Sequence, residues 1–168
     1  MLQILQAETD EHQSYIRDLF FENLSATNSL VNREFNIDYD VDAFLARDLA
    51  NIAQFSPPTG RLLLAEIEGK IVGCAGLRRI NVNIGEVKRM YVRREFRCQG
   101  IGRALLDAII KAAQQIGYTK LRLDSAPFAQ AAQQLYTSAG FVNIAPYSES
   151  EIPKEYHHAW KFMELKIQ

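Results

Sequence analysis

Arg97-Cys98-Gln99-Gly100-Ile101-Gly102-Arg103 is the stretch that decides the fold of this chain. It follows an apolar run and has the character of a strand end, a short basic turn and the first turn of a helix. Glycine has no Cβ, so a ligand can approach the backbone closely at Gly100 and Gly102. The first amides of a helix lack an intrahelical acceptor, and the helix dipole is positive there. The stretch therefore predicts a site for a phosphate or pyrophosphate, flanked by two arginines.

Two common phosphate-binding turns do not fit this stretch. An NTPase P-loop has Lys followed by Ser or Thr after its last glycine, and here Arg103 and Ala104 stand in those places. A dinucleotide fingerprint has a third glycine where this chain has Leu105. The stretch does match the Arg/Gln-x-x-Gly-x-Gly/Ala turn of the GCN5-related N-acetyltransferases. With the predicted strand 86–92 directly before the turn, the chain resembles this GNAT superfamily, in which the turn holds the pyrophosphate of acetyl-CoA.

Bulk properties limit the other classes of function. The length of 168 residues is typical of one domain, and we expect a single GNAT domain over residues 1–168. The net charge of −1 argues against a nonspecific nucleic-acid binder, and aromatic residues are not interleaved with the basic ones. A small polyanionic ligand suits the local cationic cluster better, which comprises Lys88, Arg89, Arg93, Arg94, Arg97 and Arg103.

The two cysteines and the apolar runs indicate the compartment. Cys74 and Cys98 are far apart without CxxC spacing, which fits a reducing environment. No apolar run is long enough to span a bilayer, and residues 1–5 lack the features of a signal peptide. We therefore expect a cytoplasmic protein with neither a membrane nor a nucleic acid as partner.

Hydrophobic periodicity predicts a chain of alternating strands and helices. Strands are expected at 2–6, 61–67, 70–77, 86–92, 120–123, 141–144 and 160–167, and helices at 11–23, from Asp40 or Asp42 to about 52, at 101–116 and at 130–139. Residues 25–36 and 145–158 are expected to be loops. Glu68-Gly69 indicates a tight hairpin, and Gly73 and Gly76 indicate a bulge or a close neighbour. A strand, helix and strand around the glycine turn predict a parallel crossover. The fold class is α/β (α+β): a mixed sheet with helices on both faces, which by resemblance is the mostly antiparallel GNAT sheet of about six to seven strands.

The resemblance implies how the cosubstrate acetyl-CoA is held. Its pantetheine arm pairs with the backbone of Met90, Tyr91 and Val92, and one amide faces the thioester oxygen. The residues that wrap the pyrophosphate are Arg97, Cys98, Gln99, Gly100, Ile101, Gly102 and Arg103. No metal is needed, and the histidines do not form a metal site. His12 is isolated, and His157 and His158 are adjacent, so in an extended chain they point to opposite faces.

Tyr136 is the candidate acid for the departing thiolate. The family segment Asn-x-x-Ala-x-x-Leu-Tyr-x-x-x-Gly-Phe is matched here at Ala132, Leu135, Tyr136, Gly140 and Phe141. Ala129 stands at the asparagine position, so a polar contact to the cofactor is lost or replaced, and Ser125 is one candidate replacement. The alternative is a core tyrosine, because a tyrosine on an apolar helix face is more often structural than catalytic.

Glu86 is the candidate base that takes the proton of the acceptor amine, since many family members carry a glutamate here. Period-2 alternation places Glu86, Lys88, Met90 and Val92 on one face if no bulge intervenes. The alternative is a solvated carboxylate, or one paired with Lys88, at the entry of the strand.

The resemblance implies an N-acetyltransferase that moves an acetyl group from acetyl-CoA to a primary amine by direct attack in a ternary complex. The acceptor, a small molecule or a peptide, would bind between residues 19–36 and 145–158, whose acidic and aromatic residues suit a cationic amine. The rival interpretations are a non-catalytic acyl-CoA sensor of the same fold and an enzyme for a larger acyl group. A homodimer stays open: family members often dimerise, but no exposed stripe in this sequence indicates one.

Overall fold

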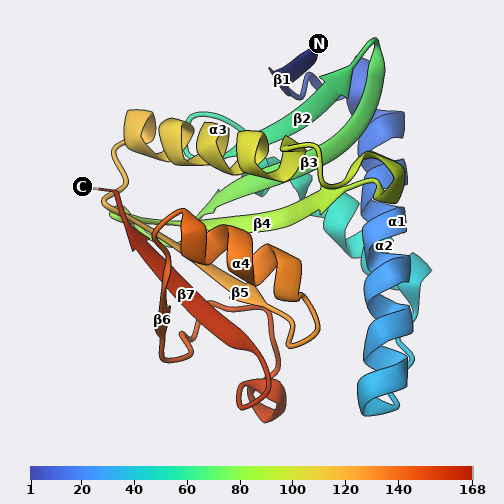
Figure 1. The fold of residues 1–168 in the computed structure, drawn as a ribbon, viewed down its shortest axis with the longest axis vertical. Coiled ribbons are helices and arrows are strands. Elements are labelled where there is room, and N and C mark those ends of the chain that lie inside the picture. Colours follow the sequence, from blue (N-terminus) through green and yellow to red (C-terminus); the bar gives the residue numbers. More distant parts are fainter. Residues whose placement is uncertain (168) are drawn as a thin grey trace.

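Seven β-strands form one sheet in a computed structural model that describes residues 1–167, apart from the Thr9 side chain (Figure 1). The strands are β1 Leu2–Gln6, β2 Arg61–Ile67, β3 Lys70–Arg79, β4 Ile84–Val92, β5 Lys120–Ser125, β6 Val142–Ile144 and β7 Lys161–Lys166. Their order in the sheet is β1-β2-β3-β4-β5-β7-β6, and only β4 and β5 pair in parallel among the described residues. The mixed, mostly antiparallel sheet and the parallel pairing across the glycine turn are confirmed. Gln168, the last residue of the expected domain, lies outside the described residues.

Helices cover both faces of this sheet, as expected. They are α1 Thr9–Phe35, α2 Val41–Ala50, α3 Ile101–Ile116 and α4 Gln130–Ser138, with short 3₁₀ helices at Ile52–Phe55, Arg94–Phe96 and Lys154–Tyr156. Side chains alternate along β2: Leu63 and Ala65 pack in the core that α3 and α4 cover, whereas Leu62 and Leu64 pack with α1 and α2. Figure 1 shows α3 and α4 in front of the sheet and α1 along its right side.

The first helix is much longer than predicted. It begins at Thr9 and continues to Phe35, through residues 25–36 that the Ser, Asn and Thr content indicated as a loop. That expectation is wrong because the low helix propensity of these residues costs only a few tenths of a kcal/mol each, and no glycine or proline interrupts them. Burial of Val31 favours the helix, which ends at Asn36 in the left-handed conformation with φ 55°.

Two local predictions are confirmed at turns and caps. The side chain of Asp40 accepts a hydrogen bond of 3.0 Å from the Ala43 amide, so Asp40 is the N-cap of α2. Between β2 and β3, Glu68 and Gly69 have φ values of 49° and 79°. Positive φ at both central residues is the geometry of a type I′ hairpin turn, whose twist matches that of the strands.

A bulge interrupts β4. Arg89 and Met90 together stand opposite the single residue Ala75 of β3, and Arg89 has a left-handed φ of 56°. Gly73 and Gly76 indicated a bulge in their own strand, and β3 does shift its register against β2 between Ile71 and Gly73. The bulge of β4 is a separate one, opposite the part of β3 between the two glycines. Phe55 is one of the close neighbours, because a Cβ added at Gly76 would lie 2.8 Å from its ring.

The bulge changes which side chains of β4 share a face. Met90 and Val92 pack in the core under α3, whereas Tyr91 packs with the core of α1 and α2. Glu86 and Lys88 lie on the Tyr91 side, since Val87 between them packs under α3. Met90 and Val92 were expected to share the face of Glu86 only in the absence of a bulge. They lie on the opposite face, because one extra residue reverses the alternation.

Strands β4 and β5 stay together only at one end. Their pairing runs from Ile84 with Lys120 to Glu86 with Arg122. Beyond that point residues 87–92 have no strand partner on the β5 side. The sheet therefore opens between its two parallel strands, at their carboxyl ends.

Candidate active site

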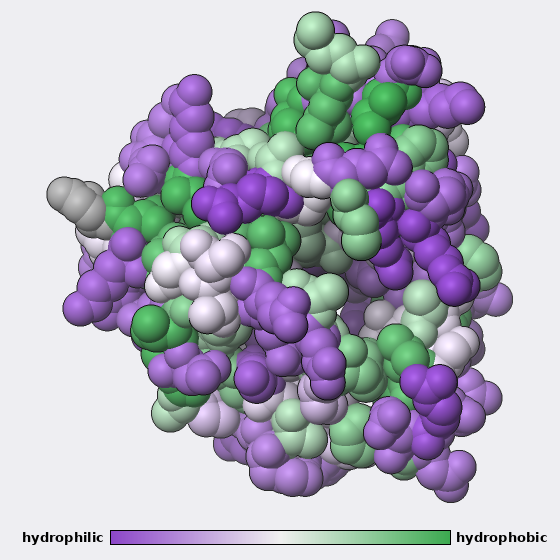
Figure 2. Space-filling model, viewed as in Figure 1, coloured by the Kyte–Doolittle hydropathy of each residue, from purple (hydrophilic) through white to green (hydrophobic). Residues whose placement is uncertain are grey.

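A cleft of about 1020 Å³ lies where β4 and β5 separate. Its walls come from α1, α2, β4, the end of β5, α4 and residues 151–160, which lead into β7. The hollow is visible between α1 and α4, to the right of the centre of Figure 2. Met90 lines this opening, on the edge of β4 that has no strand partner on the β5 side, and the carboxyl ends of parallel strands are a common ligand site.

The glycine turn forms the start of α3, as predicted. Gly100 has φ 80°, and a Cβ added there would meet no atom within 4 Å, so the space in front of it is open. In the described chain, the backbone amides of residues 100–103 have no hydrogen-bond acceptor. Open amides at the positive end of a helix dipole are an anion-binding arrangement. Cys98, also left-handed with φ 61°, is exposed in the turn.

The cationic cluster of the sequence is divided in space. Arg97 is exposed beside the turn and donates to the Val92 carbonyl at 2.8 Å. Arg103 is also exposed and pairs with Asp107 at 2.9 Å. Three members of the cluster instead form ion pairs within the fold, namely Lys88, Arg89 and Arg93. The charge available to an anion at the turn is therefore smaller than the sequence suggested.

Tyr136 lies on the cleft wall beside Met90. Burial, followed by the charge of Asp124, raises the pKa of Tyr136. Its hydroxyl has no hydrogen-bond partner among the described residues. Every side-chain nitrogen or oxygen that is fully enclosed in those residues does have a partner, so the Tyr136 hydroxyl is not fully enclosed. The hydroxyl therefore faces the open cleft. Ala129, which replaces the asparagine of the family segment, and Ser125 line the same wall.

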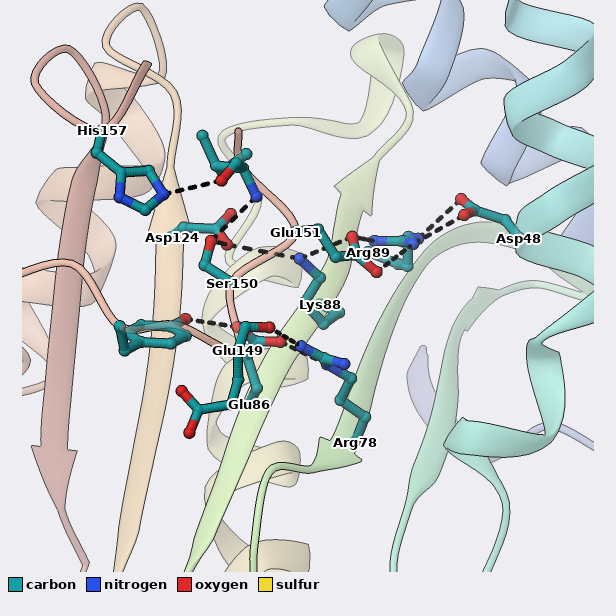
Figure 3. Close-up of polar contacts among 12 residues, drawn as sticks. Asp48, Arg78, Glu86, Lys88, Arg89, Asp124, Glu149, Ser150, Glu151 and His157 are labelled. Atoms are coloured by element: carbon teal, nitrogen blue, oxygen red, sulfur yellow. Dashed lines mark hydrogen bonds and ion pairs between the residues drawn. The ribbon is translucent and has the colours of Figure 1, made fainter. Parts of the chain in front are cut away.

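Glu86 lies behind the cleft wall instead of on it (Figure 3). Its carboxylate is fully buried; Arg78 Nε donates to one oxygen and the Tyr147 hydroxyl to the other, both at 2.5 Å. Burial raises the pKa of Glu86, although Lys88, Tyr147 and Arg78 act in the opposite direction. Its ion-pair partner is thus Arg78, and the role of Glu86 as a base stays a prediction.

A chain of charged side chains crosses the cleft (Figure 3). Asp48 of α2 accepts two hydrogen bonds from Arg89, at 2.9 and 3.0 Å. Glu151 bridges Arg89 Nη1 at 3.2 Å and Lys88 Nζ at 3.1 Å. Lys88 Nζ lies 3.6 Å from Asp124 Oδ2. This chain of side chains contains three carboxylates and two cations, so that it carries one net negative charge.

The neighbours hold these groups in their charged forms. Burial alone would lower the pKa of Lys88, but Asp124, Glu86 and Glu151 together raise it. Burial alone would raise the pKa of Glu151, but Lys88 and Arg89 lower it to about 2. Lys88 and Glu151 are therefore ionised at neutral pH.

Asp48 and Asp124 were not among the candidates from the sequence. A signal existed for Asp48, because a carboxylate in the apolar stripe of a helix needs a buried partner. For Asp124 the signal was its place at the carboxyl end of a strand in the predicted parallel pair. Neither signal identifies the partner, which the tertiary structure supplies.

Within residues 1–167, no group of three or more His, Cys, Asp and Glu side chains is arranged to hold a metal ion. None of the helices in those residues has the length and apolar character required to cross a membrane.

A sheet that opens between two parallel strands, with a glycine turn at the start of the helix that joins them, defines the acetyltransferase class of fold. The sequence profile of the acetyltransferase (GNAT) family matches residues 14–141, and the chain belongs to that family.

Relatives and solved structures agree with this assignment. An uncharacterized N-acetyltransferase of Schizosaccharomyces pombe is 33% identical over 126 residues, which cover 72% of this chain and 76% of that protein. The N-acetylaspartate synthetase of Danio rerio is 33% identical over 116 residues, which cover 67% of this chain but only 41% of that protein. A GNAT-family acetyltransferase of Staphylococcus aureus superposes over 100% of both chains with a TM-score of 0.77 and 25% identity. A Salmonella typhimurium structure with its cofactor acetyl-CoA shares the fold over 99% of this chain and 94% of its own, with a TM-score of 0.71 and 20% identity.

Proposed function

We propose that this protein, acting as a single domain, transfers an acetyl group from acetyl-CoA to the primary amine of an acceptor, by direct attack in a ternary complex. The observation that carries the proposal is the row of open amides at residues 100–103, at the start of the helix that follows the unpaired edge of β4. A pyrophosphate on these amides leaves the pantetheine arm to run along the unpaired edge of β4.

In the proposed complex, the cofactor is held mainly by backbone groups. Residues 97–103 surround the pyrophosphate, and Met90, Tyr91 and Val92 pair with the pantetheine amides, as in a strand ladder. One of these β4 amides faces the thioester oxygen and polarises the carbonyl. Acetyl-CoA is the natural choice of donor, because the Salmonella typhimurium neighbour carries it.

The transfer requires two proton movements. The acceptor nitrogen attacks the carbonyl carbon, so that a C–N bond forms and the C–S bond breaks. The ammonium loses two protons in total. The first goes to a carboxylate base and on to solvent. Tyr136 gives its own proton to the departing CoA thiolate, and the second proton of the nitrogen then passes through solvent to the Tyr136 phenolate and restores the hydroxyl. Tyr136 suits this role because its hydroxyl faces the cleft without a partner in the described chain.

Two carboxylates are candidates for the base. Glu86 comes from the sequence, and its raised pKa favours a proton, but it would need a path through the cleft wall. Asp124 lies on the cleft wall itself. We assign the first proton to Asp124 and keep Glu86 as the alternative.

The names of related proteins leave the size of the acceptor open. They include an N-acetylaspartate synthetase and, among structures with the same fold, a ribosomal-protein-S18-alanine N-acetyltransferase.

Calorimetry followed by an assay of thiol release tests the proposal. We expect purified protein to bind CoA and to release CoA from acetyl-CoA only when an amine is present. A protein that binds CoA but releases none with any amine would be the acyl-CoA sensor, and the absence of heat with CoA would end both interpretations. Competition with succinyl-CoA and longer acyl-CoA measures the acyl preference.

A further inference from the structure

The charged side chains of the cleft are not all paired. Among the described residues that line it, three are cationic and three anionic: Arg47, Lys88, Arg89, Asp48, Asp124 and Glu151. A charge that the protein leaves open toward a ligand cavity marks where a ligand of opposite charge gains most. The open charges therefore describe the acceptor.

Two of the three carboxylates are fully occupied. Both oxygens of Asp48 accept from Arg89, at 2.9 and 3.0 Å. Both oxygens of Glu151 also accept from Arg89, at 3.2 and 3.3 Å, and one lies 3.1 Å from Lys88. These two carboxylates connect parts of the fold and have little hydrogen-bonding capacity left for a ligand.

Asp124 differs from them. Its contacts all reach Oδ2, which accepts from the Ser150 hydroxyl at 2.9 Å and lies 3.6 Å from Lys88 Nζ. Oδ1 has no hydrogen-bond partner in the described chain. Since every fully enclosed polar side-chain atom there has a partner, Oδ1 is not enclosed, and it is open to the cleft that Asp124 lines. It stands at the end of β5, where the strands separate, and can accept a hydrogen bond from an ammonium there.

Arg47 is the corresponding exception among the cations. Lys88 and Arg89 each have two carboxylate partners, whereas Arg47 has no ion-pair partner among residues 1–167. Its guanidinium lies 4.3 Å from the centre of the Phe44 ring, which holds it over the wall of the cleft that α2 forms.

The rest of the wall is largely aromatic. Tyr39 packs on Phe44 at 4.7 Å on the α2 side, and Tyr156 and Trp160 lie 6.0 Å apart on the side that leads into β7. All four line the cleft, as does Phe128 after β5. An acceptor with an apolar body would remove this surface from water, at about 25 cal/mol per Å².

Resting on the proposed function, we infer that the acceptor is a free α-amino acid with a large apolar side chain. Its ammonium lies at Asp124, its carboxylate at Arg47, and its side chain against the aromatic wall. A diamine fits poorly, because Arg47 would face its second cation. A small polar amino acid such as aspartate fits poorly, because it leaves the aromatic wall in water and brings a second carboxylate.

Matched pairs of amines test this inference. Phenylalanine, leucine and tryptophan are compared with phenethylamine, isopentylamine and tryptamine, which differ only by the carboxylate. We expect kcat/KM to be at least tenfold higher for each amino acid than for its amine. Arg47→Gln should bring this ratio close to one, because it removes the charge that faces the carboxylate of the amino acid. Arg33→Gln, an exposed arginine of α1 outside the cleft lining, is the control that should preserve the ratio.

A binding measurement keeps the inference testable without turnover. Phenylalanine is titrated into the CoA-loaded protein, and we expect heat for the wild type and about tenfold weaker binding for Arg47→Gln and for Asp124→Asn, with folding of both variants checked by their melting temperatures. Equal binding of phenylalanine and phenethylamine, or no binding of either, would overturn the amino-acid assignment. The binding of CoA in the same titrations shows whether the proposed function itself has failed.

Discussion

At the scale of single residues, two candidates from the sequence occupy different settings. Tyr136 lies on the cleft wall with an unpartnered hydroxyl, whereas Glu86 is enclosed by Arg78 and Tyr147. The two residues were chosen by the same kind of evidence, a match to a family pattern. What separates them is access to the cleft, which depends on side chains from β3 and from the segment before β7.

Tyr136→Phe should lower kcat by about 100-fold, because it removes the proposed proton donor. The free energy of unfolding should change by less than about 0.5 kcal/mol, since no hydrogen bond of the described chain is lost. Single-turnover kinetics and urea unfolding measure the two quantities. Tyr118→Phe is the matched control: it loses a hydrogen bond of 2.6 Å to the Thr59 carbonyl, outside the cleft, and should cost about 1 kcal/mol with kcat unchanged. Undiminished turnover in Tyr136→Phe would remove this tyrosine from the mechanism.

Asp124→Asn should lower kcat/KM more than Glu86→Gln does. The reason is that Asp124 Oδ1 reaches the cleft, whereas Glu86 has no exposed surface. Measurement of kcat/KM for both variants under the same conditions decides between them. If only Glu86→Gln lowers kcat/KM, the base is the residue named from the sequence, and a path through the cleft wall exists.

At the scale of elements, the structure differs from the sequence prediction at α1 and β4. The periodicity of α1 fades after residue 23, yet the helix continues to Phe35 because its later turns form a wall of the cleft. In β4 a bulge is present that the sequence did not indicate for this strand, and its position determines which side chains face which core. Both differences arise from neighbours that are distant in sequence.

Asn36 offers a test of how α1 ends. Its φ of 55° is a conformation that glycine adopts without strain, and its side chain makes no hydrogen bond in the described chain. Asn36→Gly should keep or raise the free energy of unfolding by up to about 0.5 kcal/mol, and Asn36→Ala should lower it by about 1 kcal/mol. Urea unfolding of both variants provides the measurement. Equal destabilisation by the two would show that α1 does not end in this way in solution.

At the scale of the whole molecule, one ionic network connects α2, β4, β5 and the segment that leads into β7. Asp48, Arg89, Glu151, Lys88 and Asp124 are its members (Figure 3). A buried ion pair adds little net stability, but removal of one partner leaves an uncompensated charge. We therefore expect the network to hold the cleft walls in place instead of adding to the total stability.

The stability contributed by Glu151 should depend on pH. Its pKa falls from an ordinary value of 4.5 to about 2 in the folded protein, through Lys88 and Arg89 acting against burial. A lowered folded pKa stabilises the fold above pH 4.5, and this contribution is lost as the pH falls toward 2. Glu151→Gln should thus be less stable than the wild type at pH 7, by up to about 1 kcal/mol after solvent screening, and the difference should shrink below pH 4.5.

Urea unfolding at pH 7, 5, 4 and 3 measures that difference. Glu155→Gln, an exposed residue near Glu151 without an ion pair in the described chain, is the control and should show no such trend. A stability difference that is constant over this pH range would contradict an ionised Glu151 in the network.

Much of the fold could be predicted because it depends on local rules. The hairpin at Glu68 and Gly69, the cap at Asp40 and the glycine turn before α3 each require particular residues within a few positions. The candidate cofactor site was predictable for the same reason, since it consists of backbone amides at one helix start. On the acceptor side, the resemblance implied residues 19–36 and 145–158, and parts of both segments line the cleft. Asp124 and Arg47 were not predictable, because no spacing relates their elements to those segments.

The sequence by itself determined the class of fold, the strand order around the glycine turn and the place where we propose that a diphosphate binds. These follow from backbone geometry and hydrophobic period, which act over neighbouring residues. Only the tertiary structure decided that Glu86 is enclosed, that Tyr136 and Asp124 reach the same cleft, and that Arg47 keeps an open charge. The physical reason is that burial and ion pairing depend on which distant side chains meet, and a local pattern does not contain that information.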